Sequence, residues 1–407
     1  MKEITDETIK AYALKNAVEH EGKCVVGSVI SGLFAEGLKK EEIRDIMMRV
    51  SMIVNEVNKL GIELQKNELD ELAKNISHRE VRDPSELPEL PEAKKEKVIM
   101  RFRPAPSGPM HIGHMVSQMI SSLFVKHYGG KFYIFVDDTN PEETLKEAYK
   151  NIKEDCDWLF GNVYEYINAS DRIKVYYKYT EELIKKDVAY ICTCDSEEFK
   201  KLIDESKPCP CRKLSVKENE ARWEKMLDKK GYKEGEAVVR FKSDINNNNP
   251  AMRDFPLARI NEHSHPKQGK KYRVWPLMNL SVACDDIDYK MTHVIRGKDH
   301  GDNAKRQKMI FKALGKEKQF PWNFFMGRIK FTDLILSKRK IAAAIEKGEF
   351  EGYEDIRLPT IASLRKRGYK PEAFAKFATM RGLTDVDKVM SQKDLFDVID
   401  RFNRDEK

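Results

Sequence analysis

The chain has 407 residues, of which 41% are hydrophobic, and this is enough for two to four domains with sizeable cores. Its formal charge of +7 is compatible with a polyanionic partner but is too small to identify one. No apolar run approaches the ~20 residues that a membrane-spanning helix needs, and the N-terminus lacks the pattern of a signal peptide. We therefore expect a monomer in the cytoplasm that does not act at a membrane.

Residues 1–80 have the pattern of a small helical domain without a cluster of catalytic residue types. Four segments with helical spacing of apolar residues are separated by glycines and charged turns: Ile4 to Glu19, Val26 to Glu36, Lys40 to Leu60 and Leu64 to Ile76. Residues 81–97 contain three prolines among many charges and cannot bury an apolar face. This composition predicts a linker between the helical domain and a second domain.

A strand, a turn and a helix come after the linker. Val98 to Phe102 is a short apolar run typical of a buried parallel strand, and Met115 to Tyr128 has helical spacing that ends at two glycines. Prolines exclude a helix from the turn, while its glycines let the backbone approach a ligand closely. Phe132 to Val136 predicts a second buried strand. The sequence therefore predicts the first βα unit of a nucleotide-binding sheet.

Two histidines, His111 and His114, stand where the turn enters the helix. Imidazoles in this place can donate hydrogen bonds to a phosphate group. The alternatives are a zinc-binding pair or two surface histidines. Because a zinc pair on a helix usually has i, i+4 spacing and a third ligand, and nothing nearby offers one, the spacing favours phosphate binding.

Carboxylates come directly after the second predicted strand. Asp137 and Asp138 precede Thr139 and Asn140 at the point where the strand ends. Because the carboxyl ends of parallel strands face the ligand crevice of a doubly wound sheet, these carboxylates can hold an amino group or a ribose. Helix capping by Asp138 or Thr139 is an equally good interpretation of those two residues.

Four of the seven cysteines form two close pairs, which are Cys192 with Cys194 and Cys209 with Cys211. Four thiolates at this spacing predict a structural zinc site with tetrahedral geometry and no position for a reactive water. A disulfide framework is improbable in a chain of this kind. The other three cysteines lie alone in apolar surroundings and are expected to be buried free thiols: Cys24, Cys156 and Cys284.

The region between the cysteine pairs and residue 278 alternates strands with charged turns. Four basic residues there are candidates for phosphate contacts, although solvated side chains explain them equally well: Arg240, Lys242, Arg253 and Arg259. Two apolar segments, 274–283 and 292–300, are then expected to return the chain to the parallel sheet. A basic turn from Ile335 to Lys340 comes next.

These motifs together resemble class I aminoacyl-tRNA synthetases of the glutamyl and glutaminyl branch. The resemblance lies in the turn from Arg101 to His114 and in the basic turn 335–340, which are similar to the two signatures of that family. It implies an α/β fold of Rossmann type, with a doubly wound parallel sheet. The implied parts are a helical domain 1–80, a linker 81–97, sheet halves 98–190 and 271–345, a zinc-containing acceptor-binding insertion 191–270 and a helical stem-contact region 346–407.

The resemblance also implies ATP, accompanied by Mg²⁺, as a substrate. His111 and His114 would stabilise its α-phosphate, and Lys338 would stabilise the departing pyrophosphate. The residues implied in ATP binding are Pro106, Ser107, Gly108, His111, Gly113, His114, Ser337, Lys338 and Arg339.

The amino acid implied is glutamate. Arg101 and Arg296 would anchor its side-chain carboxylate and Asp137 would bind its α-amino group, whereas glutaminyl enzymes carry Cys in place of Arg296. Four residues depart from the usual pattern of the pocket: Arg103, Ala105, Phe135 where the family usually has Arg, and Met278 where it usually has Tyr.

The implied partner is tRNA, bound at its acceptor end and inner corner through residues 214–270 and 357–370. Because the chain ends at Lys407, we expect it to lack the anticodon-binding barrels of the family. Two other interpretations stay open. One is a paralog that adenylates an acidic or altered amino acid for a different acceptor. The other is a catalytically silent tRNA-binding protein, against which the four intact signature residues argue: His111, His114, Ser337 and Lys338.

Overall fold

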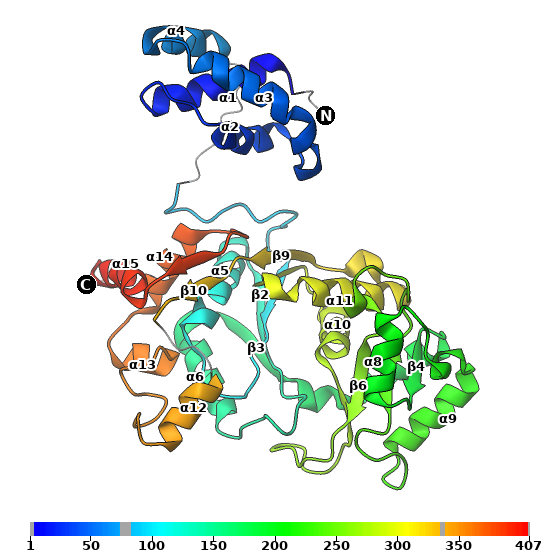
Figure 1. Cartoon of the computed structure of the whole chain (residues 1–407). Helices are drawn as coiled ribbons and strands as arrows, with labels where there is room; N and C mark the ends of the chain where they lie inside the picture. The colour runs from blue at the N-terminus through cyan, green and yellow to red at the C-terminus, as the bar shows by residue number, and fades with distance from the viewer. Residues whose placement is uncertain (1–3, 74–82, 334–337, 406–407) are drawn as a thin grey trace. The chain divides into compact units, whose positions relative to one another are not determined.

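The computed structural model describes residues 4–73, 83–333 and 338–405 (Figure 1). The chain divides into two compact units, Met1–Asp83 and Pro84–Lys407, and each has a hydrophobic core of its own. Among the helices described, none is both long enough and apolar enough to cross a membrane.

The first unit is a bundle of short helices around a core that includes Leu14, Val29 and Val54. Gln65 is fully buried in it, and its Nε2 donates to the backbone carbonyl oxygens of Gly22, Val57 and Leu60. Each of the four segments predicted to be helical contains a helix, and residues 74–76 of the last one lie outside the described part. The helices are α1 (Asp6–Glu19), α2 (Val26–Leu33), α3 (Ile43–Val57) and α4 (Ile62–Leu72). The contacts of Gln65 tie α4 to the connection before α2 and to the end of α3.

The second unit is built on parallel strands. Strand β1 pairs with β2 and β2 with β3, all in parallel, because helices α5 and α6 carry the chain back between them. The bounds of these elements are β1 (Val98–Phe102), α5 (Ile112–Tyr128), β2 (Gly130–Val136), α6 (Ala148–Phe160) and β3 (Val163–Asn168). The predicted strand 98–102 and the predicted strand and helix after it are confirmed, with α5 beginning three residues earlier than expected.

A second parallel pair continues this sheet. Strand β8 (His293–Gly297) pairs with β9 (Trp322–Met326), and Thr292 just before β8 donates its N–H to the carbonyl of Ile99 in β1 at 3.0 Å. Residues at the carboxyl ends of β1, β2 and β8 line one cavity, so these three strand ends lie together.

A four-stranded antiparallel sheet is inserted between the two parallel pieces, and Figure 1 shows it in green with its helices. Its strands pair in chain order: β4 (Ala189–Cys192), β5 (Val238–Phe241), β6 (Pro256–Ile260) and β7 (Val274–Pro276). The helices of this region are α7 (Ile173–Lys185), α8 (Ser196–Asp204) and α9 (Val216–Leu227). Ser215 caps α9, since its hydroxyl accepts the N–H of Glu218.

The apolar segment 274–283 does not return the chain to the parallel sheet, so that prediction is wrong. Its first three residues form β7 at the edge of the antiparallel sheet, and the rest begins helix α10 (Met278–Asp288), most of whose residues are buried. A continuous apolar run has no periodicity that separates a strand from a buried helix, which is why the sequence misled here.

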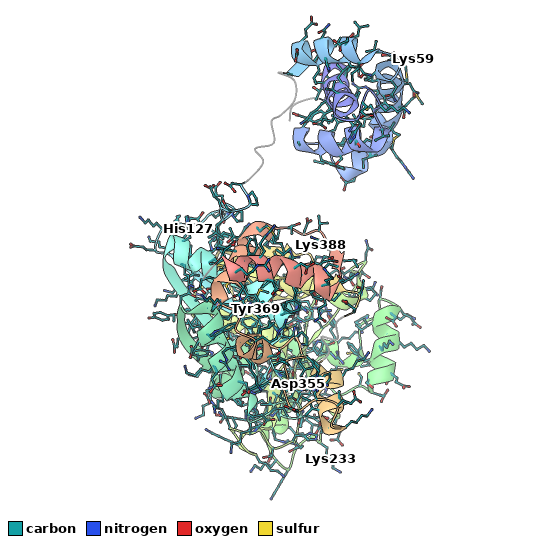
Figure 2. The ribbon with its side chains drawn as sticks, turned by 90° about the vertical axis from the view of Figure 1, so that its left-hand side faces the viewer. Lys59, His127, Lys233, Asp355, Tyr369 and Lys388 are labelled. Carbon is teal, nitrogen blue, oxygen red and sulfur yellow. The ribbon has the colours of Figure 1, made fainter. Side chains whose placement is uncertain are left out.

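Helix α14 (Pro371–Arg381), in the C-terminal part of the chain, packs against helices α5 and α6. Tyr369 lies within the body of the unit, as Figure 2 shows, and its hydroxyl donates to Asp400 at 2.5 Å. An isolated β-bridge joins Thr360 to His111, beside hydrogen bonds from Ile112 to Pro359 and from Ile361 to Met110, each 3.0 Å long. The remaining elements are α11 (Gly301–Ala313), β10 (Ile329–Phe331), α12 (Lys338–Glu346), α13 (Ile361–Lys366), α14 (Pro371–Arg381), β11 (Lys388–Met390) and α15 (Gln392–Arg404).

Candidate active site

The turn between β1 and α5 presents two histidines at the start of the helix. Gly108 has a φ of 147°, which side chains with a Cβ rarely adopt, and so lets the turn reverse before α5. The Nδ1 of His111 accepts the N–H of Gly113 at 3.1 Å, and the Nδ1 of His114 accepts the N–H of His111 at 3.2 Å. In a neutral imidazole the other nitrogen then carries the hydrogen. Both rings therefore carry an Nε2–H donor, with ring centres 4.0 Å apart.

The two aspartates after β2 have different surroundings. Asp138 is fully buried and accepts hydrogen bonds from the Ser170 backbone and hydroxyl, both 2.7 Å long, and from the Tyr149 hydroxyl at 2.6 Å. Asp137 is partly exposed, and its N–H donates to the carbonyl of Pro104. Of the interpretations left open by the sequence, a structural role therefore fits Asp138, and a ligand-facing role fits Asp137.

A cavity of about 270 Å³ lies at this edge of the sheet. It brings together all four residues predicted to bind the amino acid, which are Arg101, Asp137, Met278 and Arg296, and it is also lined by His114. Three further lining residues were not singled out as ligand contacts from the sequence: Arg103, His300 and Gln307. The latter two lie in or before helix α11, and no local pattern marks them.

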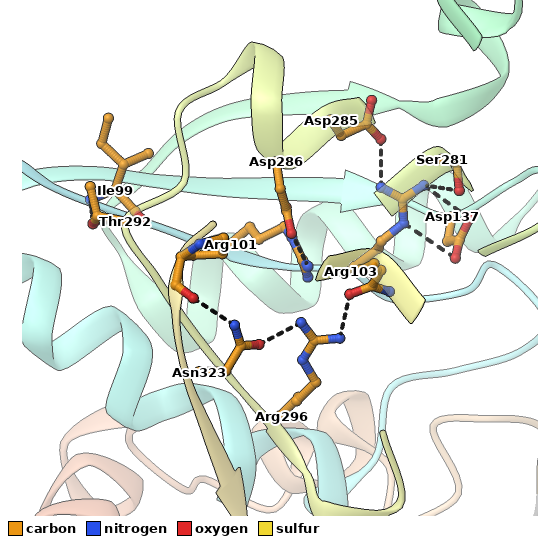
Figure 3. A network of polar contacts seen from close by, with 12 residues as sticks. Ile99, Arg101, Arg103, Asp137, Ser281, Asp285, Asp286, Thr292, Arg296 and Asn323 are labelled. Atoms are coloured by element: carbon orange, nitrogen blue, oxygen red, sulfur yellow. Dashed lines mark hydrogen bonds and ion pairs between the residues drawn. The ribbon is translucent and has the colours of Figure 1, made fainter. Parts of the chain in front are cut away.

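Arg101, which lines this cavity, is paired with a buried carboxylate behind it. Its Nε and Nη2 donate to the two oxygens of Asp286 at 2.5 and 2.8 Å, and both side chains are almost completely buried (Figure 3). This geometry is bidentate and charge-assisted. The pair links the end of β1 to helix α10.

Arg103 lies between two other carboxylates. Its Nη1 donates to Asp285 at 2.5 Å, its Nη2 donates to Ser281 at 3.0 Å, and its Nε is 3.3 Å from an oxygen of Asp137 (Figure 3). Burial disfavours the charged form, but the charges of Asp137 and Asp285 outweigh it and raise the pKa of Arg103 well above its usual range.

Arg296 differs from these two arginines because its hydrogen-bond partners are neutral. Its Nη1 donates to Gln307 at 2.9 Å and its Nη2 to Asn323 at 2.6 Å, whereas its Nε is buried without a partner. Among the residues described, no carboxylate forms an ion pair with it. Burial and the nearby charge of Arg101 lower the pKa of Arg296 to about 10, so it remains a cation at neutral pH.

Other residues predicted to bind ATP are only partly described. Pro106 lies in the turn, where its carbonyl accepts the N–H of Leu145 at 2.9 Å, and Ser107 and Gly113 are partly exposed there. Ser337 lies outside the described residues. Helix α12 begins at Lys338, but the side chains of Lys338 and Arg339 are not among those described.

The four paired cysteines come together in the insertion. The Sγ atoms of Cys192 and Cys209 are 3.8 Å apart, and so are those of Cys194 and Cys211. The Sγ atoms of Cys192, Cys194 and Cys211 all lie within 4.8 Å of one another. A tetrahedral zinc ion with Zn–S bonds of ~2.3 Å holds its sulfurs ~3.8 Å apart. The two pairs at 3.8 Å match this spacing, whereas Cys209 lies outside the group of three sulfurs that are all within 4.8 Å of one another. The three isolated cysteines are buried free thiols, as predicted: Cys24, Cys156 and Cys284.

Comparison with known proteins gives concordant matches. The family profile described as tRNA synthetases class I (E and Q), catalytic domain, matches residues 97–404. The glutamate–tRNA ligase of Methanocaldococcus jannaschii is 41% identical over 393 residues, covering 96% of this chain and 69% of that protein. The glutamate–tRNA ligase of Pyrococcus furiosus is 42% identical over 392 residues, covering 94% of this chain and 68% of that protein.

A solved structure agrees with the fold. The glutamate tRNA ligase of Elizabethkingia meningosepticum in complex with its amino acid matches with a TM-score of 0.53 and 20% identity, covering 76% of this chain and 70% of that one. At this identity the match concerns the fold alone. The family profile and the archaeal relatives carry the assignment further, and the chain therefore belongs to the class I tRNA synthetases of the E and Q group, in the family of the glutamate–tRNA ligases.

Proposed function

We propose that this chain activates glutamate with ATP and transfers the glutamyl group to the 3′ end of a tRNA. The choice of glutamate rests on Arg296, which is a cation that lines the cavity and whose hydrogen-bond partners are neutral side chains. A buried charge without a counter-ion is unfavourable, and a carboxylate from the substrate would supply the missing partner. The neutral amide of glutamine would not.

In the first step, an α-carboxylate oxygen of glutamate attacks the α-phosphorus of ATP. The bond from that phosphorus to the bridging oxygen of the β-phosphate breaks, and pyrophosphate leaves with the electron pair. The Nε2–H groups of His111 and His114 would donate hydrogen bonds to the α-phosphate, at the positive end of the seventeen-residue helix α5. Lys338 would offset the charge that develops on pyrophosphate, and Mg²⁺ would accompany the nucleotide, as in this class.

The second step is acyl transfer. A hydroxyl oxygen of the terminal ribose of the tRNA forms a bond to the carbonyl carbon of the adenylate and loses its proton to the departing phosphate oxygen or to water. AMP leaves with the electron pair of the broken C–O bond. Asp137 would hold the α-ammonium group throughout. Arg101 remains a proposed second anchor, although its bidentate pair with Asp286 already offsets its charge. Met278 would supply only apolar contact.

The acceptor end of the tRNA would lie against the insertion. Of the four basic residues proposed for phosphate contacts, Lys242 pairs with Asp187 and Arg253 donates to the carbonyl of Ile203. Arg240 and Arg253 line a further cavity of about 450 Å³, and Arg259 lines one of about 210 Å³; both cavities adjoin Met278. Because Arg253 is held by three backbone carbonyls and Arg240 only by one long hydrogen bond of 3.5 Å, Arg240 and Arg259 are the better candidates. The region 357–370 would contact the inner corner. Charging of tRNA in the cytoplasm is the setting that this function implies.

We also infer a structural zinc ion bound by Cys192, Cys194, Cys209 and Cys211. The hydrogen bond between Cys192 and Cys209 lowers the pKa of Cys209 and raises that of Cys192, so this pair holds one proton that a bound zinc ion would displace. The ion would fix the connection between β4 and α9, next to Arg222, whose Nη1 donates to Cys211 at 3.3 Å. It would take no part in the chemistry, because four protein ligands fill its coordination sphere.

Pyrophosphate exchange measured with each amino acid, with and without tRNA, tests the proposed function. We expect glutamate to support exchange and glutamine to support much less. Better exchange with glutamine or with a neutral amino acid would overturn the assignment of glutamate. Formation of the adenylate without transfer to any tRNA would instead point to a different acceptor.

A further inference from the structure

Arg103 connects a fixed carboxylate to one that faces the cavity. Asp285 is completely buried and is held from two other sides, by Arg172 at 2.7 Å and by the hydroxyl of Tyr176 at 2.9 Å. Asp137, in contrast, is 17% exposed and lines the cavity. The guanidinium of Arg103 spans both, with its short contact to Asp285 and its contacts of 3.3 Å to each oxygen of Asp137.

This arrangement has two effects. The first is electrostatic, because a cation between Asp137 and Asp285 cancels the repulsion that two neighbouring carboxylates would otherwise exert on each other. The second is geometric. Arg103 is held by Asp285 and by the hydroxyl of Ser281. Its Nη2 donates to Oδ1 of Asp137, and its Nε lies 3.3 Å from Oδ2, so these two contacts together limit the rotation of that carboxylate.

The pairing of β1 with β2 determines which residue lies beside the Arg103 cation. Phe102 pairs with Ile134 in the register of β1 and β2, so the next pair of positions brings Arg103 beside Phe135. The guanidinium carbon lies 5.6 Å from the centre of the Phe135 ring. The cation carried by β1 therefore lies beside an apolar ring of β2.

We propose that Arg103 is a positioning residue for the α-ammonium group of the substrate, and that it acts by holding the Asp137 carboxylate in the orientation that receives this group. The proposal rests on the proposed function, because it takes the occupant of the cavity to be an amino acid. It assigns to Arg103 no contact with the reacting atoms. Its consequence is that removing Arg103 weakens the recognition of the amino group specifically, and leaves recognition of the side-chain carboxylate at Arg296.

A comparison of glutamate with glutarate, which has the same two carboxylates and no amino group, isolates this effect. Binding of both compounds to the full chain is measured by calorimetry for the unaltered protein and for Arg103→Met. The matched control is Arg172→Met, which also removes an ion pair with Asp285 but alters no residue that lines the cavity. The ratio of the two affinities reports the amino group alone, as in a double-mutant cycle.

The unaltered protein should bind glutamate about tenfold or more tightly than glutarate, as a charge-assisted contact allows. In Arg103→Met this ratio should fall towards one, while in Arg172→Met it should stay unchanged. Arg103→Lys is a milder variant for the case in which Arg103→Met does not fold. Because a lysine is a point charge that cannot span both oxygens of Asp137, it should give an intermediate ratio.

Equal weakening of glutamate and glutarate by Arg103→Met would overturn the proposal, since it would show that Arg103 serves only the stability of the fold. Tighter binding of glutamate by this variant would also overturn it, because Arg103 would then be a competitor of the amino group. If the unaltered protein binds neither compound, the proposed function itself fails, and this inference fails with it.

Discussion

Arg296 and Asn323 share a hydrogen bond of 2.6 Å, in which the guanidinium Nη2 donates to the amide oxygen. The Arg296 cation is thus bound here by the amide oxygen of Asn323, which carries only a partial charge. The amide is held in place because its nitrogen donates to the carbonyl of Pro321 at 2.7 Å. Asparagine has an NH₂ group where aspartate has a charged oxygen. Because Asn323 is neutral, the positive charge of Arg296 stays available to a substrate carboxylate.

In Asn323→Asp, the new side-chain carboxylate should therefore compete with the substrate carboxylate for Arg296. The new carboxylate would pair with Arg296 and raise the KM for glutamate by about tenfold or more, since a charge-assisted pair contributes ~1.5–3 kcal/mol. The KM for ATP should not change. Steady-state pyrophosphate exchange measures both constants. Asn248→Asp, on an exposed loop, makes the same chemical change away from the cavity and should leave both constants as they were. An unchanged KM for glutamate in Asn323→Asp would contradict the role of Arg296.

His114→Ala should lower the rate of adenylate formation by about 10²–10³-fold, because it removes a donor aimed at the charge that develops on the α-phosphate. Glutamate affinity should change little. Rapid mixing with excess ATP and glutamate separates the chemical step from binding. His127→Ala, in the exposed last turn of the same helix, is the control. If the rate of adenylate formation in His114→Ala equals that of the unaltered protein, His114 does not take part in the chemical step.

The freshly purified chain should contain one zinc ion, measured by elemental analysis. Cys209→Ser should lose it, because three thiolates and a neutral hydroxyl bind zinc far more weakly than four thiolates, and the melting temperature should fall with it. Cys24→Ser removes a buried thiol in the other unit and should keep the metal. Unaltered protein that is free of zinc, when prepared without chelators, would refute the site.

Stability should depend on pH through Asp155. This side chain is 2% exposed, and its burial raises its pKa from 3.8 to about 7. Because the folded state then holds a proton that the unfolded state has lost, the free energy of unfolding falls as pH rises from about 4 to about 7, and the penalty is complete above that range. Asp155→Asn should raise the melting temperature at pH 8 and change it little at pH 4.5. An equal shift at both pH values would show that ionisation of Asp155 does not matter.

The sequence was sufficient for the signature turn and for four of the residues that line the cavity: Arg101, Asp137, Met278 and Arg296. Prolines and glycines determine the turn locally, and Asp137 and Arg296 end parallel strands, whose carboxyl ends must share an edge. Such arguments need no knowledge of distant contacts.

What the sequence did not reveal depends on pairs far apart in the chain. Arg103 and Asp285 are separated by 182 positions, and no local pattern states that one will neutralise the other. The same holds for Asp138, whose structural role depends on Ser170 and Tyr149. Helix α10 was missed because its buried residues leave no polar face to give it a period.

The β-bridge between His111 and Thr360 has a consequence for how the protein is made. Its two sides are about 250 residues apart, so at ~5–20 residues per second a ribosome needs roughly 10–50 s to synthesise the second after the first. Throughout that time the backbone of Met110 and Ile112 lacks the partners that Pro359 and Ile361 later provide. A nascent chain arrested before residue 359 should therefore hold its first βα unit without a finished nucleotide site, and affinity for ATP should arise only after this segment has left the ribosome.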